Sequence, residues 1–289
     1  MEISEIVLAD DNYPELLRQI TDPPDKLFVW GDPAVLAGDA LAIVGSRKPS
    51  DYGVRVATNL ARDLCRYLTI ISGLAYGIDT VALTEAAPSG KAIAIIGSGL
   101  DRENFYPASN RHLAEKIVSC GGAVISEYPL GTPPLKYHFP ARNRIIAGLS
   151  LGVLVVEAAL KSGALITADL ALQFNREVFA VAGSIFTPQA AGANQLIKDG
   201  AQIVTHPADI LNSLGIALAD QPLNLAIDLA PLEQTIINIL NNEINGLSVN
   251  EIVTLTQLDS RKVSSTLTMM EIKGVVKSVG AGKFTCLLT

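Results

Sequence analysis

The sequence predicts an α/β protein: a Rossmann-like domain with a doubly wound parallel sheet, followed by a C-terminal winged-helix domain. Three observations lead to this prediction. Seven short runs rich in Val, Ile and Ala alternate with helix-length segments, without the polar alternation of half-exposed strands. Glycine-containing loops follow most of these runs. Beyond residue 230, three helical segments precede two strand-like runs joined by a glycine turn.

Strands and helices are expected to alternate between residues 41 and 204. The expected strands are 41–44, 68–72, 92–96, 123–126, 153–156, 178–181 and 202–204. The expected helices are 52–67, 79–87, 109–119 and 164–175. Strands joined by crossover helices run parallel, and ligands of such a sheet bind in the crevice outside the carboxyl ends of its strands.

The chain divides into four regions. Residues 1–40 are predicted to be an N-terminal extension that packs on the Rossmann-like domain, with a short helix near Tyr13 and one strand at 27–30. The Rossmann-like domain itself is expected at 41–214, a linker without periodicity at 215–230, and the winged-helix domain at 231–289. Its helices are expected at 231–241, 248–256 and 260–273, and its hairpin at 275–288.

The third helix of the winged-helix domain is predicted to bury Val263, Leu267 and Met270, which follow helical spacing. Its outward face would carry Arg261, Ser264, Ser265 and Thr268. Such a helix can enter the major groove of duplex DNA. The domain has five acidic and five basic residues, however, whereas DNA-reading modules usually have a basic excess. A protein-contact or structural role is therefore favoured.

The composition indicates a well-buried globular protein, since 49% of the 289 residues are hydrophobic and 18% are charged. No apolar run approaches the roughly 20 residues that span a bilayer. The first residues are acidic, so a cytoplasmic protein is expected. Cys65, Cys120 and Cys286 have neither zinc-site nor disulfide-framework spacing, so we expect reduced thiols, no metal and no other cofactor.

The net charge of -7 lies in the first 40 residues, which hold nine acids and two bases. The rest of the chain is balanced, with 15 residues of each sign over 41–229 and five of each over 230–289. An acidic total therefore does not exclude a polyanionic ligand, because attraction depends on the local field where arginines cluster.

The segment 139–150 holds the strongest candidate ligand-binding residues. Arg142 and Arg144 flank Asn143 just before an apolar run, which predicts a short helix that docks on the sheet while both arginines reach toward a ligand. Guanidinium groups match phosphate oxygens bidentately, so the ligand is predicted to carry phosphate. The alternative, an exposed helix start with ion-paired arginines, stays open.

Glycine and polar residues follow the predicted strands at the edge where their carboxyl ends meet. Glycine allows close backbone approach, and a helix N-terminus beyond it offers free N–H groups to an anion. Together with the arginines, these loops predict a phosphate-binding crevice. Its candidate residues are Gly45, Ser46, Arg47, Gly73, Gly77, Arg142, Asn143, Arg144, Ser162 and Gly163. Neither GxGxxG nor GxxxxGK[ST] occurs, which argues against the usual dinucleotide and P-loop sites.

The sequence contains no evident catalytic constellation, and we expect no enzymatic activity. The three histidines lack metal-ligand spacing, although His138 is close enough to Arg142 in sequence to contact the same ligand. Asp79, Glu127 and Glu157 fall near strand ends, where a helix N-terminus or an arginine accounts for each without acid-base chemistry. No GxSxG elbow supports a nucleophile.

Five ordered motifs within residues 13–211 resemble the DNA-processing protein A family, also called Smf. They are Ala42–Arg47, Ser72–Asp79, Phe139–Ser150, Glu157–Ala168 and Gly192–Ala201. The winged-helix domain is similar to an appendage that many members carry. The resemblance implies an extended Rossmann-like domain in a protein that binds and protects single-stranded DNA, forms a homodimer, and loads the RecA recombinase during natural transformation and recombination. By the same resemblance, Arg47, Arg142 and Arg144 line a basic DNA-binding pocket.

The sequence departs from the family pattern at Ala141, where members often have a basic residue. Binding is expected to be sequence-tolerant and salt-sensitive, with stacking secondary because only 5% of residues are aromatic. A few arginines per protomer bind weakly, which favours a homodimer that spans two pockets. Two other functions stay open: a nucleotide-binding hydrolase of the phosphoribohydrolase type, and a winged-helix transcriptional regulator.

Overall fold

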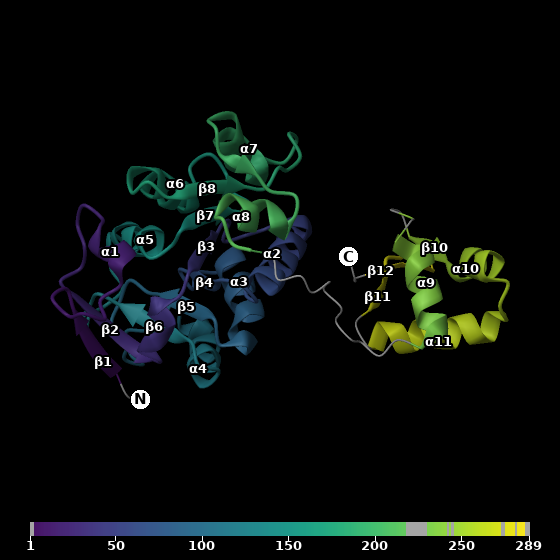
Figure 1. The fold of residues 1–289 in the computed structure, drawn as a ribbon, viewed down its shortest axis with the longest axis horizontal. Coiled ribbons are helices and arrows are strands. Elements are labelled where there is room, and N and C mark those ends of the chain that lie inside the picture. Colours follow the sequence, from purple (N-terminus) through teal and green to yellow (C-terminus); the bar gives the residue numbers. More distant parts are fainter. Residues whose placement is uncertain are drawn as a thin grey trace. The chain divides into compact units, whose positions relative to one another are not determined.

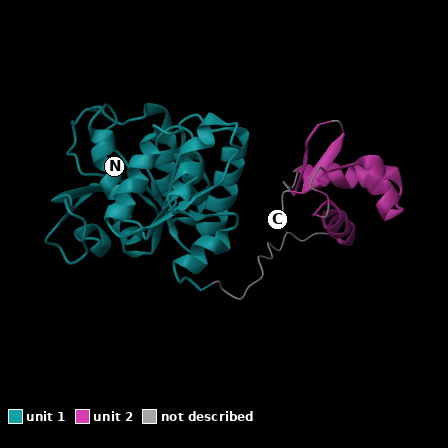
Figure 2. Cartoon of the chain, turned by 90° about the horizontal axis from the view of Figure 1, so that it is seen from above, with its two compact units in different colours: residues 1–218 teal, residues 219–289 magenta. Residues whose placement is uncertain are grey.

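The computed structural model describes residues 3–217, 230–241, 243, 246–272, 275–280 and 282–286. The chain forms two compact units, residues 1–218 and 219–289 (Figure 2). Most of the linker expected at 215–230 lies outside the described residues. Within the described part of the chain, no helix is both long and apolar enough to cross a membrane.

The first unit is organised around one large sheet. Its strands are β1 (Ile3–Val7), β2 (Lys26–Gly31), β3 (Ala40–Val44), β4 (Thr69–Ser72), β5 (Ala92–Ile95), β6 (Ala123–Ser126), β7 (Gly152–Val155), β8 (Glu177–Ala180) and β9 (Gln202–Ile203). They are arranged in the order β1-β2-β6-β5-β4-β3-β7-β8-β9. The strands β3 to β9 pair in parallel, so the seven strands expected from the apolar runs are confirmed.

Helices cover both faces of this sheet, as a doubly wound sheet requires. One face carries α2 (Asp51–Leu64), α3 (Ile78–Ala86), α4 (Arg111–Ser119) and α8 (Pro207–Ser213). The other carries α1 (Glu15–Arg18), α5 (His138–Gly148), α6 (Gly163–Gln173) and α7 (Ala191–Lys198). Short 3₁₀ helices lie at Pro33–Ala37, Ala87–Ser89, Ala108–Asn110 and Pro188–Ala190. Successive residues of β3 alternate between the two cores: Leu41 and Ile43 pack toward α2 and α3, Ala42 and Val44 toward α5 and α6. Figure 1 shows α2 and α5 on opposite sides of β3.

The strand order creates a topological switch point between β3 and β7. From β3 the chain adds β4, β5 and β6 on one side, and then returns to place β7 on the other side of β3. The loops that follow β3 and β7 therefore diverge to opposite faces and leave a crevice at their carboxyl ends, which is where doubly wound proteins bind ligands.

The N-terminal extension lengthens the same sheet. β2 pairs antiparallel with β6, and β1 pairs antiparallel with β2. Only the strand near Phe28 was expected, so β1 is an addition to the prediction. β1 forms the edge of the sheet, and only Ile6 of its five residues is buried, so its sequence lacks the continuous apolar run of the central strands.

The second unit has the winged-helix arrangement. Its elements are α9 (Pro231–Asn241), β10 (Leu247–Ser248), α10 (Val249–Thr256), α11 (Ser260–Ile272), β11 (Val276–Ser278) and β12 (Lys283–Cys286). β11 and β12 form the predicted hairpin, and β10 pairs with the other edge of β12. Val263, Leu267 and Met270 are fully buried as predicted. Residues 261, 264, 265 and 268 of α11 are exposed, also as predicted.

Candidate nucleic-acid interface

A cavity of about 770 Å³ opens at the switch point between β3 and β7. It is lined by the loop after β3, by one side of α5, and by the loop that leads from β7 into α6. Seven of the ten candidate residues line it: Gly45, Ser46, Arg47, Arg142, Asn143, Ser162 and Gly163. Gly73, Gly77 and Arg144 lie outside its lining.

The loop after β3 depends on two glycines for its course. A Cβ on Gly45 would lie 2.7 Å from the Ile78 side chain and 2.9 Å from the Glu157 carbonyl oxygen. Gly77 has φ +80°, and a Cβ there would meet the Ser46 carbonyl oxygen. The Ser46 N–H donates to the Glu157 carbonyl at 2.6 Å, which ties the loops after β3 and β7 together. Gly77, in the loop after β4, is thus outside the lining, but its lack of a side chain leaves room for the Ser46 and Arg47 backbone.

The N-terminus of α6 forms another wall. The Ser162 hydroxyl caps this helix by accepting from the Ala164 N–H at 3.3 Å. Asn143 on α5 donates from its side-chain amide to the Gly163 carbonyl at 3.3 Å, so it links the two helices. A Cβ on Gly163 would have open space around it. Ser162, Gly163 and Ala164 line the cavity, so the positive end of the dipole of this eleven-residue helix adjoins a cavity that is also lined by cations.

Arg142 is buried behind the cavity. It is 5% exposed, and its Nη1 donates to the Ile95 carbonyl at 2.6 Å, while its Nε is buried without a hydrogen-bond partner. Burial lowers the pKa of Arg142 to about 10, against the opposing charge of Asp79, so the guanidinium stays charged at neutral pH. Burial raises the pKa of Asp79, whose Oδ2 accepts from the Gly73 and Ala75 N–H groups. A Cβ on Gly73 would collide with Arg142, so this glycine makes room for the guanidinium.

Exposed cations surround the buried arginine. Arg47, Lys136 and Lys161 line the cavity and are exposed to solvent. Among its lining residues the only carboxylate is Asp79, which is buried. The two lysines were not among the predicted site residues. Lys161 lies beside the predicted Ser162 and could have been found there, whereas Lys136 precedes α5 and reaches the cavity only through the tertiary fold.

Two aromatic rings also line the cavity. Tyr106 and Phe139 have ring centroids 5.2 Å apart at an interplanar angle of 52°. Tyr106, which lies in the segment between β5 and α4, was not among the predicted site residues. His138, considered as a ligand contact, is instead buried, stacks on Tyr128 at 3.9 Å, and has its Nδ1 3.2 Å from the Gly97 carbonyl oxygen.

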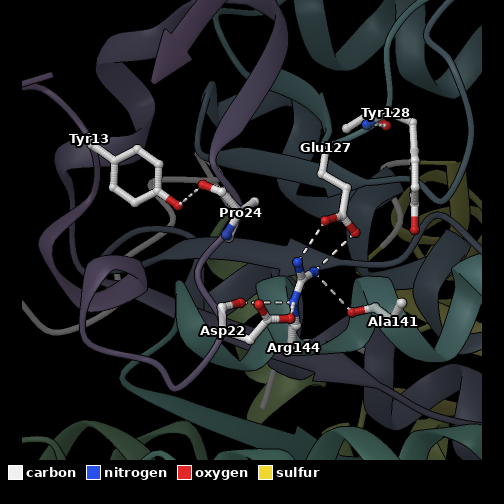
Figure 3. A network of polar contacts seen from close by, with 8 residues as sticks. Tyr13, Asp22, Pro24, Glu127, Tyr128, Ala141 and Arg144 are labelled. Atoms are coloured by element: carbon white, nitrogen blue, oxygen red, sulfur yellow. Dashed lines mark hydrogen bonds and ion pairs between the residues drawn. The ribbon is translucent and has the colours of Figure 1, made fainter. Parts of the chain in front are cut away.

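The prediction that Arg144 reaches into the same crevice is wrong. Its Nη1 and Nη2 donate to the two carboxylate oxygens of Glu127 at 3.0 and 2.7 Å, and its Nε donates to the Asp22 carboxylate at 3.1 Å (Figure 3). It also donates to the Asp22 and Ala141 carbonyl oxygens. Arg144 therefore links α5 to the end of β6 and to the N-terminal extension. It is ion-paired, as in the alternative that stayed open, but it lies within α5 and is largely buried rather than at an exposed helix start.

The carboxylates near the strand ends have structural partners. Glu127 pairs with Arg144, and Asp79 accepts backbone N–H groups in the loop before α3. Glu157 accepts from the Ser50 N–H at 2.8 Å and from the Ser50 hydroxyl at 2.6 Å, at the N-terminus of α2. Within the described ranges, no group of three or more His, Cys, Asp and Glu residues could hold a metal ion. Each of these carboxylates is accounted for by charge or helix capping.

The fold and the cavity define a class: a doubly wound α/β protein with a cationic crevice at its switch point and a winged-helix appendage. The chain belongs to the DNA recombination-mediator protein A family, which matches residues 4–215. The DprA winged helix domain matches residues 220–282.

Relatives in several bacteria support this assignment. Protein Smf of Escherichia coli strain K12 is 49% identical over 216 residues, which cover 74% of this chain and 57% of that protein, so this chain spans little more than half of it. DNA processing protein DprA of Streptococcus pneumoniae strain ATCC BAA-255 / R6 is 46% identical, over 71% of this chain and 72% of that protein.

Two solved structures are similar over most of the chain. The X-ray structure of DNA processing protein A from Streptococcus pneumoniae has a TM-score of 0.69 at 41% identity, covering 76% of each chain. A structure of DNA processing protein A from Helicobacter pylori, which concerns its single-stranded DNA binding mode, has a TM-score of 0.66 at 31% identity, covering 74% of this chain and 96% of that one.

Proposed function

We propose that this protein is a non-catalytic, cytoplasmic DNA-processing protein that binds single-stranded DNA in the cavity between β3 and β7. The observation that carries the proposal is the composition of that cavity. Arg47, Lys136, Arg142 and Lys161 converge on it from three separate segments, together with the N-terminus of α6. The family assignment and the relative described with a single-stranded DNA binding mode support the same ligand.

The wall chemistry suits a phosphodiester chain with splayed bases. Phosphates would contact the exposed Arg47, Lys136 and Lys161, while buried Arg142 supplies positive potential from behind with little loss of side-chain entropy. Tyr106 and Phe139 offer ring faces on which a base can stack. The exposed charged side chains of the lining are cations, which suit phosphates rather than base edges, so sequence-tolerant binding is expected.

The test is fluorescence anisotropy of labelled single-stranded and duplex oligonucleotides over a salt titration. We expect wild type to prefer the single strand, with log Kd changing by about 0.7 per log unit of salt for each phosphate neutralised. Arg47→Ala and Lys161→Ala should each weaken binding and reduce that slope by about 0.7. Arg62→Ala is the matched control, because Arg62 is exposed in the last turn of α2 and pairs with Glu85.

Three outcomes would decide against this site. No single-strand binding at low salt would remove the proposal and direct the search to nucleotide ligands of a hydrolase. A preference for duplex that Arg47→Ala leaves unchanged would favour the winged helix and a regulatory role. If Arg47→Ala and Arg62→Ala reduced the salt dependence of log Kd equally, DNA binding would depend only on the total charge of the protein and not on this cavity.

We further propose that the protein acts as a homodimer that protects incoming strands and loads RecA recombinase on them in transformation and recombination. The family's description as a recombination mediator supports this role. A second pocket would raise the effective concentration of a strand already held by the first. Sedimentation of the protein with and without oligonucleotide tests the dimer. Stimulation of RecA filament assembly on coated single strands, lost in Arg47→Ala, tests the loading step.

A further inference from the structure

Two adjacent apolar side chains project from the loop that follows β8. Ile185 is 85% exposed and Phe186 is 89% exposed, the highest values among the large hydrophobic residues of the described chain. An exposed Phe beside an exposed Ile has no role in the core, and such patches commonly mark interaction sites. The proposed function does not use this loop, because neither residue lines the cavity.

The backbone that presents these side chains is tightly held. Asn194 on α7 makes two hydrogen bonds to Gly183, accepting from its N–H and donating to its carbonyl, each at 3.0 Å. The Tyr52 hydroxyl on α2 donates to the Ala182 carbonyl at 2.9 Å. The Thr187 N–H donates to the Ser184 carbonyl at 3.0 Å, which closes a turn around the exposed pair. A ligand that covers the two side chains would therefore not have to order the loop first.

This loop adjoins the wall of the cavity. β8 is the neighbour of β7 in the sheet, and Figure 1 shows α6, β8 and α7 together at one end of the unit. The Gly192 N–H at the start of α7 donates to the Ala158 carbonyl at 2.7 Å, and Ala159 beside it lines the cavity. Leu160, the next residue, is 63% exposed and precedes the basic Lys161. An exposed apolar side chain and an exposed cation are therefore adjacent in the chain at this wall of the cavity.

We propose that Ile185 and Phe186 form a second subsite for single-stranded DNA, on which a base leaving the cavity stacks. The inference rests on the proposed function. Its occupant follows from charge. Exposed Lys161 lines the cavity, and exposed Lys48 lies four residues before Tyr52, whose hydroxyl bonds the base of this loop, so a strand that leaves the cavity toward the loop has cations for its phosphates. An aromatic face next to a basic track is the arrangement that single-strand binders use for bases of any sequence.

The test compares short and long single strands by anisotropy at one salt concentration. An oligothymidine of about four nucleotides should fill the cavity alone, whereas one of about 20 should also reach the loop. Phe186→Ala should weaken binding of the long strand by at least about fivefold and leave the short strand unchanged. Leu172→Ala is the matched control. Leu172 is also an exposed apolar side chain, 59% exposed, but it lies near the C-terminal end of α6, whereas the N-terminal end of this helix lines the cavity.

A second variant gives a direct signal. Trp30 is the single tryptophan and is only 8% exposed, so the indole introduced by Phe186→Trp would dominate any ligand-dependent change in fluorescence. The proposal expects quenching by the long strand, with affinity close to wild type, and none by the short one.

The outcomes separate this inference from the proposed function. If Arg47→Ala weakens both strands while Phe186→Ala weakens neither, the cavity stands and the second subsite is refuted. If Arg47→Ala weakens neither, the proposed function fails, and the subsite that rests on it fails too. If Phe186→Ala lowers self-association in sedimentation and leaves long-strand affinity intact, the loop is a protein interface and the subsite is refuted.

Discussion

The ion pair between Arg144 and Glu127 is expected to stabilise the first unit far more than the pair between Arg144 and Asp22. The side chains of Arg144 and Glu127 are 16% and 15% exposed, whereas the Asp22 side chain is 82% exposed. Breaking a fully buried pair costs about 3–5 kcal/mol, and an exposed pair is worth at most about 1 kcal/mol. Arg144 retains Asp22 and the Ala141 carbonyl when Glu127 is lost, so Glu127→Gln should cost about 2 kcal/mol.

Urea denaturation followed by the fluorescence of Trp30 measures this cost. The single tryptophan lies on β2, which pairs with β6 just before Glu127, so its signal reports the region that Arg144 fastens. Asp22→Asn is the matched control, with an expected loss below about 1 kcal/mol that shrinks further in high salt. The slope of free energy against urea should be the same in both variants, which would show that only stability has changed.

The reasoning is refuted if the two variants lose equal stability. Equal losses would mean that burial does not set the strength of these contacts and that the fastening of α5 depends on the backbone carbonyls that Arg144 also binds. If the loss of stability in Asp22→Asn persisted in high salt, the reasoning would be refuted as well, because salt screens an exposed ion pair.

Three further predictions follow from particular contacts. Gly73→Ala would place a Cβ 2.7 Å from both the Arg142 Cζ and the Asp79 Oδ2, so it should lower the free energy of unfolding by about 1–3 kcal/mol and weaken single-strand binding. Gly163→Ala is the control and should fold normally, because its Cβ meets open space. Calorimetry measures the stability of both variants, and anisotropy measures their binding. Ser248→Ala removes the hydroxyl of a capping box with Glu251 and should cost the second unit about 1 kcal/mol, measured by thermal unfolding against exposed Ser265→Ala. Burial raises the pKa of Tyr13 to about 12 from 10.0, so this phenol ionises at lower pH in the unfolded chain than in the folded one. The free energy of unfolding should therefore fall as pH rises from about 10 to 12. Urea titrations across this pH range should show a smaller fall for Tyr13→Phe.

The central sheet could be predicted because its strands are buried on both faces. Ala40–Val44 and Gly152–Val155 are buried at every position, and such strands read as continuous apolar runs in any sequence. The edge strand Ile3–Val7 has a single fully buried residue, so its pairing depends on Lys26–Gly31 beside it rather than on its own composition. Local sequence therefore identifies interior strands better than edge strands.

The cavity was only partly predictable, because its residues come from segments that the chain order separates. Strand-end glycines locate the crevice, since parallel strands end at one edge. Lys136 and Tyr106 reach it from long loops whose course no periodicity determines. These two residues are brought to the cavity only by the tertiary fold. They provide one of the exposed cations of the cavity and one of its two aromatic rings.

The different environments of Arg142 and Arg144 follow from where α5 begins. Arg142 and Arg144 could both turn to one ligand only if the triplet 142–144 lay before the helix or in its first turn. α5 begins at His138, so the triplet lies within the helix, where residues two apart point about 200° from each other. The side chains of Arg142 and Arg144 must therefore lie on nearly opposite sides of α5. Arg142 faces the carboxyl end of β5 and the cavity, and Arg144 faces Glu127 and the N-terminal extension, so the same triplet provides both the buried charge of the candidate site and the ion pair that holds its helix in place.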